Sequence, residues 1–303
     1  MKNFIVSCDT SADMPKSWYE KNGVHYIVMK RILNGQDITE CFDKDEEFDK
    51  FYENIKKGDL PTTAALNPFE IKEFFEGILK SAPTGDIVHI ALSSGLSATF
   101  NNALSAAKEI NKTLKGRQIH VIDSFTGTVG IGMQVEFMVA ARDKGMKTSE
   151  ALEKLKHFRD HQHGWIVMSD LFHLKRGGRI SPAKAAIGSV LNIRPVIHLS
   201  AKGKLAMENK VRGNVKAVKY LLSCLAKYGE KWAKENGQDF SKATIWMIRT
   251  SKSDLYDMLV ENVRAAYPDA HLRSVIVGPI IGTHLGCGGA AVLFSGAPRL
   301  DIE

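Results

Sequence analysis

Short apolar runs alternate with helical patterns through the first half of this chain, and that alternation restricts the folds it can adopt. Residues 3–7, 86–92 and 118–124 are apolar runs of strand length, each followed by a polar turn and then a helical pattern. A helix between two strands returns the chain to the same end of the sheet, so such strands pair in parallel. We therefore predict an α/β protein whose N-terminal domain has a mainly parallel sheet with helices on both faces.

The remaining elements are predicted from the same periodicities. Helices are expected after a cap near Asp13, at 46–57 and 69–80, within 93–110, up to about 141, and at 148–159, 217–235 and 253–266. Further strands are expected at 25–33, 164–170, 195–200, 204–212, 243–250 and 273–277. The pattern changes near Thr148, so we predict two domains, 1–148 and 149–303, the second also α/β.

The composition indicates a soluble globular protein. Hydrophobic residues make up 44% of the 303 residues, yet apolar runs such as 243–248 and 274–281 are far shorter than a membrane span of about 20 residues. The N-terminal segment becomes polar too early for a signal peptide, so we expect a cytoplasmic protein. The four cysteines are scattered without metal-ligand spacing, and we predict neither a metal nor a cofactor.

The basic charge is compatible with nucleic acid, an acidic protein surface or an anionic ligand as partner. The net charge is +7, and the densest basic segment, 173–184, contains two glycines and a proline, which predicts a loop. No DNA-binding motif or aromatic basic platform accompanies it, so we expect no nucleic-acid partner. Arg176 and Arg179 flank the glycine pair and, with Arg212 more weakly, are candidates to donate to a carboxylate or phosphate, the alternative being solvated charges.

A glycine-rich run at 278–289 surrounds His284. Glycine has no Cβ, so this backbone and the imidazole can approach a small anion closely. The alternative is a tight turn that leads into a strand at 290–294, with His284 in a structural role.

Hydroxyl groups gather in loops that we expect at the carboxyl edge of the sheet. Ser93, Ser94 and Gly95 follow the strand at 86–92, and the loops 9–13 and 123–128 follow its neighbours. Backbone N–H groups and hydroxyls before a helix form an anion site, although a serine that simply caps the helix fits the same pattern. Thr63 and its neighbour Thr62 offer further donors, or ordinary loop caps.

The chain carries no nucleotide-binding loop, zinc-protease motif or local catalytic triad. Anion-directed features without an activated nucleophile favour a binding protein over a self-contained enzyme. The alternative is an enzyme that acts alone on a small anionic substrate, with His284 as its acid or base.

Eight motifs in order resemble the DegV family across nearly the whole chain. They are DTSAD at 9–13, PTTAALNP at 61–68, SSGLSATFNNA at 93–103, DSFTGTVGIG at 123–132, LKRGGRIS at 174–181, LNIRPVI at 191–197, KVRG at 210–213 and GPIIGTHLG at 278–286. The chain has TAALN where the family usually has TSQPS, SGLSATF where it usually has SGLSGTY, and Cys287 in the turn after His284. These differences change the small residues that line each loop.

The resemblance implies a two-domain α/β fold with a tunnel between the domains that holds a long-chain fatty acid such as palmitate or oleate. Thr63 and Ser94 would bind its carboxylate, with Ser93, the Gly95 N–H and His284 nearby. Such a protein is a carrier without catalytic residues. It presents the acyl carboxyl to a separate ATP-dependent fatty acid kinase, which makes acyl phosphate for phospholipid synthesis.

The resemblance assigns the arginines to this partner. Arg176 and Arg212, with Arg179 beside them, would form the docking or phosphoryl-transfer face. Basic residues at the mouth also allow transient contact with an anionic membrane surface.

Overall fold

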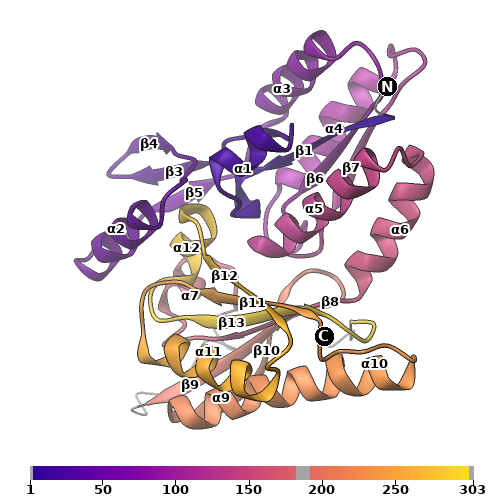
Figure 1. The fold of residues 1–303 in the computed structure, drawn as a ribbon. Helices are drawn as coiled ribbons and strands as arrows, with labels where there is room; N and C mark the ends of the chain where they lie inside the picture. The colour runs from indigo at the N-terminus through magenta and orange to yellow at the C-terminus, as the bar shows by residue number, and fades with distance from the viewer. Residues whose placement is uncertain (1–2, 182–191, 300–303) are drawn as a thin grey trace. The chain divides into compact units, whose positions relative to one another are not determined.

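The computed structural model describes residues 3–181 and 192–299, and the chain forms two compact units (Figure 1). The first unit contains Met1–Lys44 and Thr63–Arg159, and the second contains Asp45–Thr62 and Asp160–Glu303. The early segment Asp45–Thr62 therefore packs with the C-terminal half of the chain. The ranges 1–148 and 149–303 stay a prediction about independently folding domains.

The first unit is built on the parallel sheet that the sequence predicts. Its four strands lie in the order β2(His25–Ile27), β1(Phe4–Asp9), β6(Asp86–Ala91) and β7(Ile119–Asp123), and every neighbouring pair is parallel. Phe4, Val6, Ile87 and Val88 are completely buried, as expected for a sheet covered on both faces.

Helices and a small second sheet complete the first unit. The helices are α1(Lys16–Lys21), α3(Pro68–Ser81), α4(Thr99–Asn111), α5(Val129–Asp143) and α6(Thr148–Asp160), and the small sheet has the order β4(Gln36–Thr39), β3(Lys30–Leu33), β5(Thr62–Ala64). The start of α3 is set by a capping box, in which the Asn67 side chain accepts from Glu70 N and the Glu70 side chain accepts from Asn67 N.

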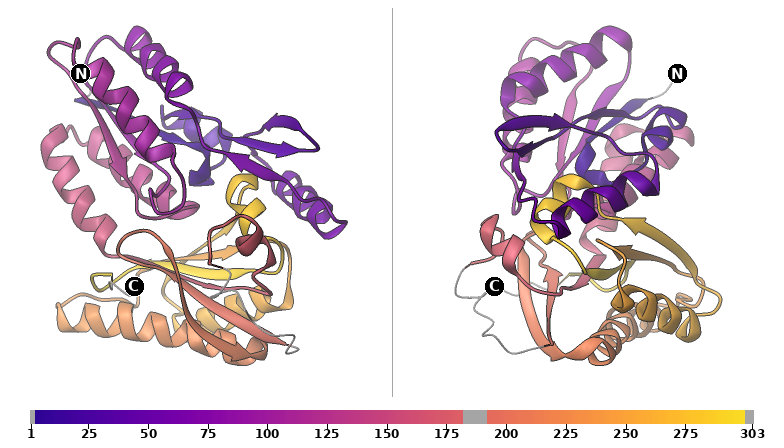
Figure 2. Two further views of the ribbon diagram at one scale, coloured as in Figure 1. Left: turned by 180° about the vertical axis from the view of Figure 1, so that it is seen from behind. Right: turned by 90° about the vertical axis from the view of Figure 1, so that its left-hand side faces the viewer.

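The second unit contains a mixed six-stranded sheet. Its order is β10(Leu205–Arg212), β9(Ile193–Leu199), β8(Gln162–Val167), β13(Ala290–Ser295), β11(Thr244–Arg249) and β12(His271–Ile276). Only the β11 and β12 pair is parallel among these described strands. Helices α9(Gly213–Cys224) and α11(Asp254–Ala266) lie on one face of the sheet and bury an apolar core that includes Leu221, Leu259 and Val292 (Figure 2).

Two elements predicted near the N-terminus differ from the structure. The predicted strand 25–33 is divided between β2 and β3, which belong to different sheets. The helix predicted near Asp13 begins instead at α1, after a short 3-10 helix η1(Thr10–Ala12) that Asp9 caps. Asp13 adopts a left-handed backbone with φ 51°, which ends the 3-10 helix rather than starting an α-helix.

The helix predicted at 217–235 is interrupted. A π-helical segment, η2(Leu225–Glu230), separates α9 from α10(Lys231–Glu235). Gly229 lies in this segment, and a Cβ at that position would collide with the ring of Phe240. The close approach of Phe240 therefore requires glycine here.

Within the described part of the chain, no helix combines the length and apolarity needed to cross a bilayer.

Candidate ligand site

Hydrogen bonds join the loop after β1 to the end of β6. One Asp9 carboxylate oxygen accepts from Leu92 N at 2.8 Å, and the other accepts from Ser11 N at 3.0 Å. Asp9 is completely buried, and this burial raises the pKa of its carboxyl. Asp9 thus fixes the polar loop 9–13 beside the residue that precedes Ser93.

The loop after β6 is joined in turn to the loop after β7. Ser94 N donates to Asp123 Oδ1 at 3.1 Å, and Ser93 N donates to Thr126 O at 3.1 Å. These contacts confirm that three polar loops meet at the carboxyl edge of the parallel sheet.

Within the loop after β6, Ser93, Ser94 and Gly95 have different surroundings. Ser93 is fully buried and its Oγ accepts from Gly95 N at 3.1 Å, so the Gly95 N–H is already used inside the loop. Ser94 is exposed. Of these three residues, Ser94 is the one whose side chain is most open to a ligand.

The interpretation of Ser93 or Ser94 as a helix cap is wrong. Helix α4 begins only at Thr99, and its N-cap is Ala98. Leu96 N and Ser97 N both donate to Ser93 O, at 2.9 and 3.0 Å, so a separate turn precedes the helix. The positive end of the helix dipole therefore lies at Thr99, and Ser94 depends on loop geometry instead.

The loop that carries Thr63 is fixed to the start of the same helix. Thr63 lies half-buried in β5. Farther along this loop, Leu66 N donates to Thr99 Oγ1 at 3.4 Å, and Asn102 Nδ2 donates to Leu66 O at 2.8 Å. Ser97 Oγ also lies 3.0 Å from Thr99 Oγ1. The start of α4 therefore contacts both the segment that follows Thr63 and the turn that follows Ser94.

His284 lies in a helix, so the turn predicted at 278–289 is wrong over its first part. Helix α12(Pro279–Leu285) begins with proline at its first position, and Gly286 follows its last residue with φ 72°. Proline and glycine at these positions are typical of a helix start and end. The glycine-rich turn is confined to the residues after this helix.

A second short helix, α7(Phe172–Arg176), packs against α12. The histidine of each helix lies against the glycine that follows the other helix. A Cβ at Gly177, the residue after α7, would overlap His284 Nδ1. A Cβ at Gly286, the residue after α12, would overlap the ring of His173. Each glycine therefore makes room for the histidine of the other helix. Sequence reasoning missed His173, because no motif distinguishes it from an ordinary helical residue.

The basic segment predicted as a loop at 173–184 begins in α7, and its residues 182–184 lie outside the described part of the chain. Arg176 donates through Nη1 to Leu60 O at 3.3 Å and through Nη2 to Pro61 O. It thereby fixes the backbone of residues 60 and 61, which belong to the same unit. Arg179 donates to Gly177 O. Arg212 is exposed at the end of the edge strand β10 and precedes α9.

The electrostatics around His284 favour a neutral imidazole and a bound anion. Burial, followed by the charges of Arg179, Arg176 and His173, lowers the pKa of His284 to about 4. Its ring is therefore neutral at pH 7, so one ring nitrogen can donate a hydrogen bond and the other can accept one. The same guanidinium groups that disfavour imidazolium would attract a carboxylate or phosphate.

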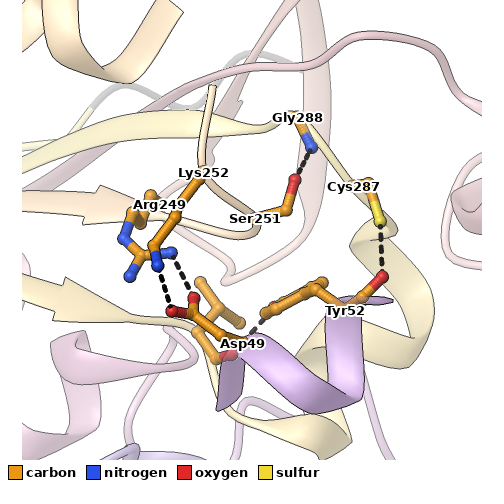
Figure 3. A network of polar contacts seen from close by, with 8 residues as sticks. Asp49, Tyr52, Arg249, Ser251, Lys252, Cys287 and Gly288 are labelled. Atoms are coloured by element: carbon orange, nitrogen blue, oxygen red, sulfur yellow. Dashed lines mark hydrogen bonds and ion pairs between the residues drawn. The ribbon is translucent and has the colours of Figure 1, made fainter. Parts of the chain in front are cut away.

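Helix α2(Asp45–Lys56) is fixed to the second unit by a network of polar contacts (Figure 3). Asp49 Oδ1 accepts from Arg249 Nη1 at 3.0 Å, and Asp49 Oδ2 lies 2.7 Å from Lys252 Nζ. Tyr52 Oη donates to Val277 O at 2.8 Å, and Cys287 Sγ lies 3.5 Å from Tyr52 O. Val277 and Cys287 stand before and after α12, so the two Tyr52 contacts hold α2 beside both ends of α12.

Cys287 is a thiol rather than a reactive thiolate. Burial raises its pKa above the ordinary value. Among the described residues, His, Cys, Asp and Glu side chains form no group of three suited to hold a metal ion. The candidate ligand-binding side chains are instead the hydroxyls of Thr63, Ser93 and Ser94, the imidazole of His284 and the neighbouring guanidinium groups, which suit an oxyanion.

A comparison with protein families decides the relationship of this chain. The model described as "Uncharacterised protein, DegV family" matches residues 3–296. This chain belongs to the DegV family. A DegV domain-containing protein of Clostridium perfringens is 29% identical, with the alignment covering 98% of each chain. Protein DegV of Bacillus subtilis is 27% identical over 96% of this chain and 98% of its own.

Solved structures of DegV proteins have the same fold. A Bacillus subtilis DegV structure, described as a fatty acid binding protein, is 26% identical with a TM-score of 0.81, covering 98% of this chain and 100% of that chain. A DegV family protein from Thermus thermophilus, whose structure is described as one of fatty acid binding, is 23% identical with a TM-score of 0.82. The match covers 97% of this chain and 100% of that chain.

Proposed function

We propose that this chain binds a long-chain fatty acid such as palmitate or oleate and holds its carboxylate with Thr63 and Ser94. The observation that carries the proposal is the exposed Ser94 in a loop fixed at the carboxyl edge of the sheet, in a DegV chain. The Bacillus subtilis relative described as fatty acid binding supports the choice of ligand.

Each polar group has a distinct part in this proposal. The hydroxyls of Thr63 and Ser94 donate to the carboxylate oxygens, and such hydrogen bonds to a charged group are among the stronger ones. Ser93 and Gly95 keep the loop in shape through the bond between Ser93 Oγ and Gly95 N. His284, neutral and beside two arginines, is proposed as a further donor.

The acyl chain supplies most of the affinity. Burial of apolar surface stabilises a complex by about 0.8 kcal/mol per CH₂, so a chain of about 16 carbons gains far more than the head group. An apolar tunnel needs no polar specificity for this purpose. The head-group contacts then select a carboxylate over a neutral lipid.

We further propose that the bound carboxylate is presented to a separate ATP-dependent fatty acid kinase. The kinase would transfer the γ-phosphoryl group of ATP to a carboxylate oxygen, giving acyl phosphate and ADP for phospholipid synthesis. Arg176, Arg179 and Arg212 are proposed to serve the docking or phosphoryl-transfer face. The sequence supports this division of labour, because it contains no nucleotide-binding loop of its own.

The alternative of a stand-alone enzyme has weaker support. A pKa of about 4 leaves His284 deprotonated and weakly basic at pH 7, whereas an efficient acid or base has a pKa near the working pH.

Solvent extraction and mass spectrometry of the purified protein test the proposal. We expect one fatty acid per wild-type chain and a clearly lower occupancy in the Thr63→Ala/Ser94→Ala variant. The Thr113→Ala/Ser81→Ala variant makes the same chemical changes elsewhere in the first unit and should keep the lipid. An empty wild type that also rejects added palmitate and oleate would contradict the proposal and favour a small-anion enzyme.

A further inference from the structure

We propose that Asp123 is a positioning residue for Ser94: its carboxylate sets the shape of the head-group loop without touching the ligand. The functional part of this inference rests on the proposed fatty acid binding, and the structural part does not. The sequence motifs place residues 123–128 at the correct edge of the sheet but assign no role to Asp123.

One carboxylate oxygen of Asp123 joins two loops. Asp123 Oδ1 accepts from Ser94 N at 3.1 Å and from Phe125 N at 3.1 Å. Asp123 is the last residue of β7, it pairs in register with Ala91 at the end of β6, and only 9% of it is exposed. The carboxylate therefore reaches from one strand end to the loop of the neighbouring strand.

Backbone contacts around Asp123 repeat this link. Ser93 N donates to Thr126 O at 3.1 Å, and Ser124 N donates to Ala91 O at 3.3 Å. The Arg159 guanidinium donates to Asp123 O at 3.0 Å and lies 4.3 Å from the centre of the Phe125 ring. The loop after β7 is thus fixed from both sides, which makes it a rigid support for Ser94.

The backbone of this supporting loop needs such fixing. Phe125 has φ 50° and Thr128 has φ 51°. Residues other than glycine adopt such positive φ values only at a cost in free energy. The bond from Phe125 N to Asp123 holds the first of these residues in place. Removing the acceptor should therefore release Phe125 and Ser94 together.

The charge of Asp123 gives the inference its sharpest consequence. A carboxylate beside a site for another carboxylate repels the ligand, so its benefit comes from accepting hydrogen bonds and not from its charge. The amide oxygen of asparagine accepts the same two N–H groups and removes the repulsion. Asp123→Asn should keep the loop and bind the anion at least as well, whereas Asp123→Ala should lose the loop.

Amide hydrogen exchange on the ligand-free protein tests the structural part. In Asp123→Ala we expect residues 93–97 to exchange about 10-fold faster than in wild type, since one hydrogen bond is worth roughly that factor. In Asp123→Asn, whose neutral oxygen accepts the same bonds more weakly, we expect a rate between those of wild type and Asp123→Ala and closer to that of wild type. Unchanged exchange in Asp123→Ala would overturn the inference.

Asp86→Ala is the matched control. Asp86 Oδ1 accepts from Gln118 N at 2.8 Å, so the same kind of bond joins the same two strands at their opposite ends. This variant should leave exchange at 93–97 unchanged. If Asp123→Ala does not fold, Asp123→Glu displaces the carboxylate by one methylene and should show the same faster exchange.

Binding of palmitate and of hexadecanol, its neutral counterpart, tests the functional part. We expect Asp123→Ala to weaken palmitate binding by about 10-fold. We expect Asp123→Asn to bind palmitate as tightly as wild type or more tightly, with hexadecanol binding unchanged. Weakening of palmitate binding in Asp123→Asn to the level of Asp123→Ala would contradict the inference. If wild type binds neither probe, the proposed function fails, and the exchange result still decides the role of Asp123.

Discussion

At the scale of single residues, His284 makes stability depend on pH. Its pKa is lowered from 6.5 to about 4 in the folded protein, so folding favours the neutral ring. This stabilisation is fully present above pH 6.5 and is lost as the pH falls from there towards 4. We expect the free energy of unfolding, measured with urea, to fall less steeply over this range in His284→Gln.

Exposed His157 provides the control for this measurement. His157→Gln should keep the wild-type slope. The other buried histidines are present in all three proteins, so the comparison isolates His284. An identical slope in wild type and His284→Gln would show that the buried imidazole is not linked to folding.

Gly177 is predicted to be intolerant of alanine for steric reasons alone. Its backbone is ordinary, with φ −75°, but a Cβ there would overlap His284 Nδ1. We expect Gly177→Ala to lower the free energy of unfolding by about 1–3 kcal/mol, the usual cost of overpacking.

Gly77→Ala separates this steric cost from the backbone effect. Gly77 lies inside α3 with nothing within 4 Å of an added Cβ, so alanine should stabilise by about 0.5–1 kcal/mol. Thermal melting of both variants would suffice, and a Gly177→Ala protein as stable as wild type would rule out the packing of α7 against α12.

At the scale of elements, the attachment of α2 depends on Asp49. Burial opposes ionisation of Asp49, but hydrogen bonds from Lys252 and Arg249 outweigh it and lower the pKa of the carboxyl. Because Lys252 is largely exposed, we expect Asp49→Ala to cost only about 1–2 kcal/mol of stability. Limited proteolysis should cleave more readily within 45–62, whereas Glu53→Ala, an exposed acid on the same helix, should leave cleavage unchanged. Equal cleavage in both variants would refute the role of Asp49.

Periodicity was sufficient to predict the parallel sheet and the edge where its polar loops meet, because buried strands and helices differ in their apolar spacing. It was insufficient for α12, although Pro279 and Gly286 are helix start and end signals. The glycine inside this helix suggested a turn. Gly282 is there because Tyr52 packs against it and leaves no room for a Cβ.

At the scale of the whole molecule, the order of the chain does not match its division into units. The segment Asp45–Thr62 belongs to the second unit through contacts such as Asp49 with Arg249 and Tyr52 with Val277. These partners are far apart in sequence, so no local pattern reveals them. The candidate site also depends on contacts between segments that are distant in sequence, since Asp123 and Ser94 meet only after β6 and β7 pair.

The central claim is that Thr63 and Ser94 bind a fatty acid carboxylate. Titration of the delipidated protein with palmitate tests it most directly. The account predicts one site per wild-type chain and an affinity about 100-fold weaker in Thr63→Ala/Ser94→Ala, because two hydrogen bonds to a charged group are removed. Equal affinity in the two proteins, or no binding by wild type, would contradict it.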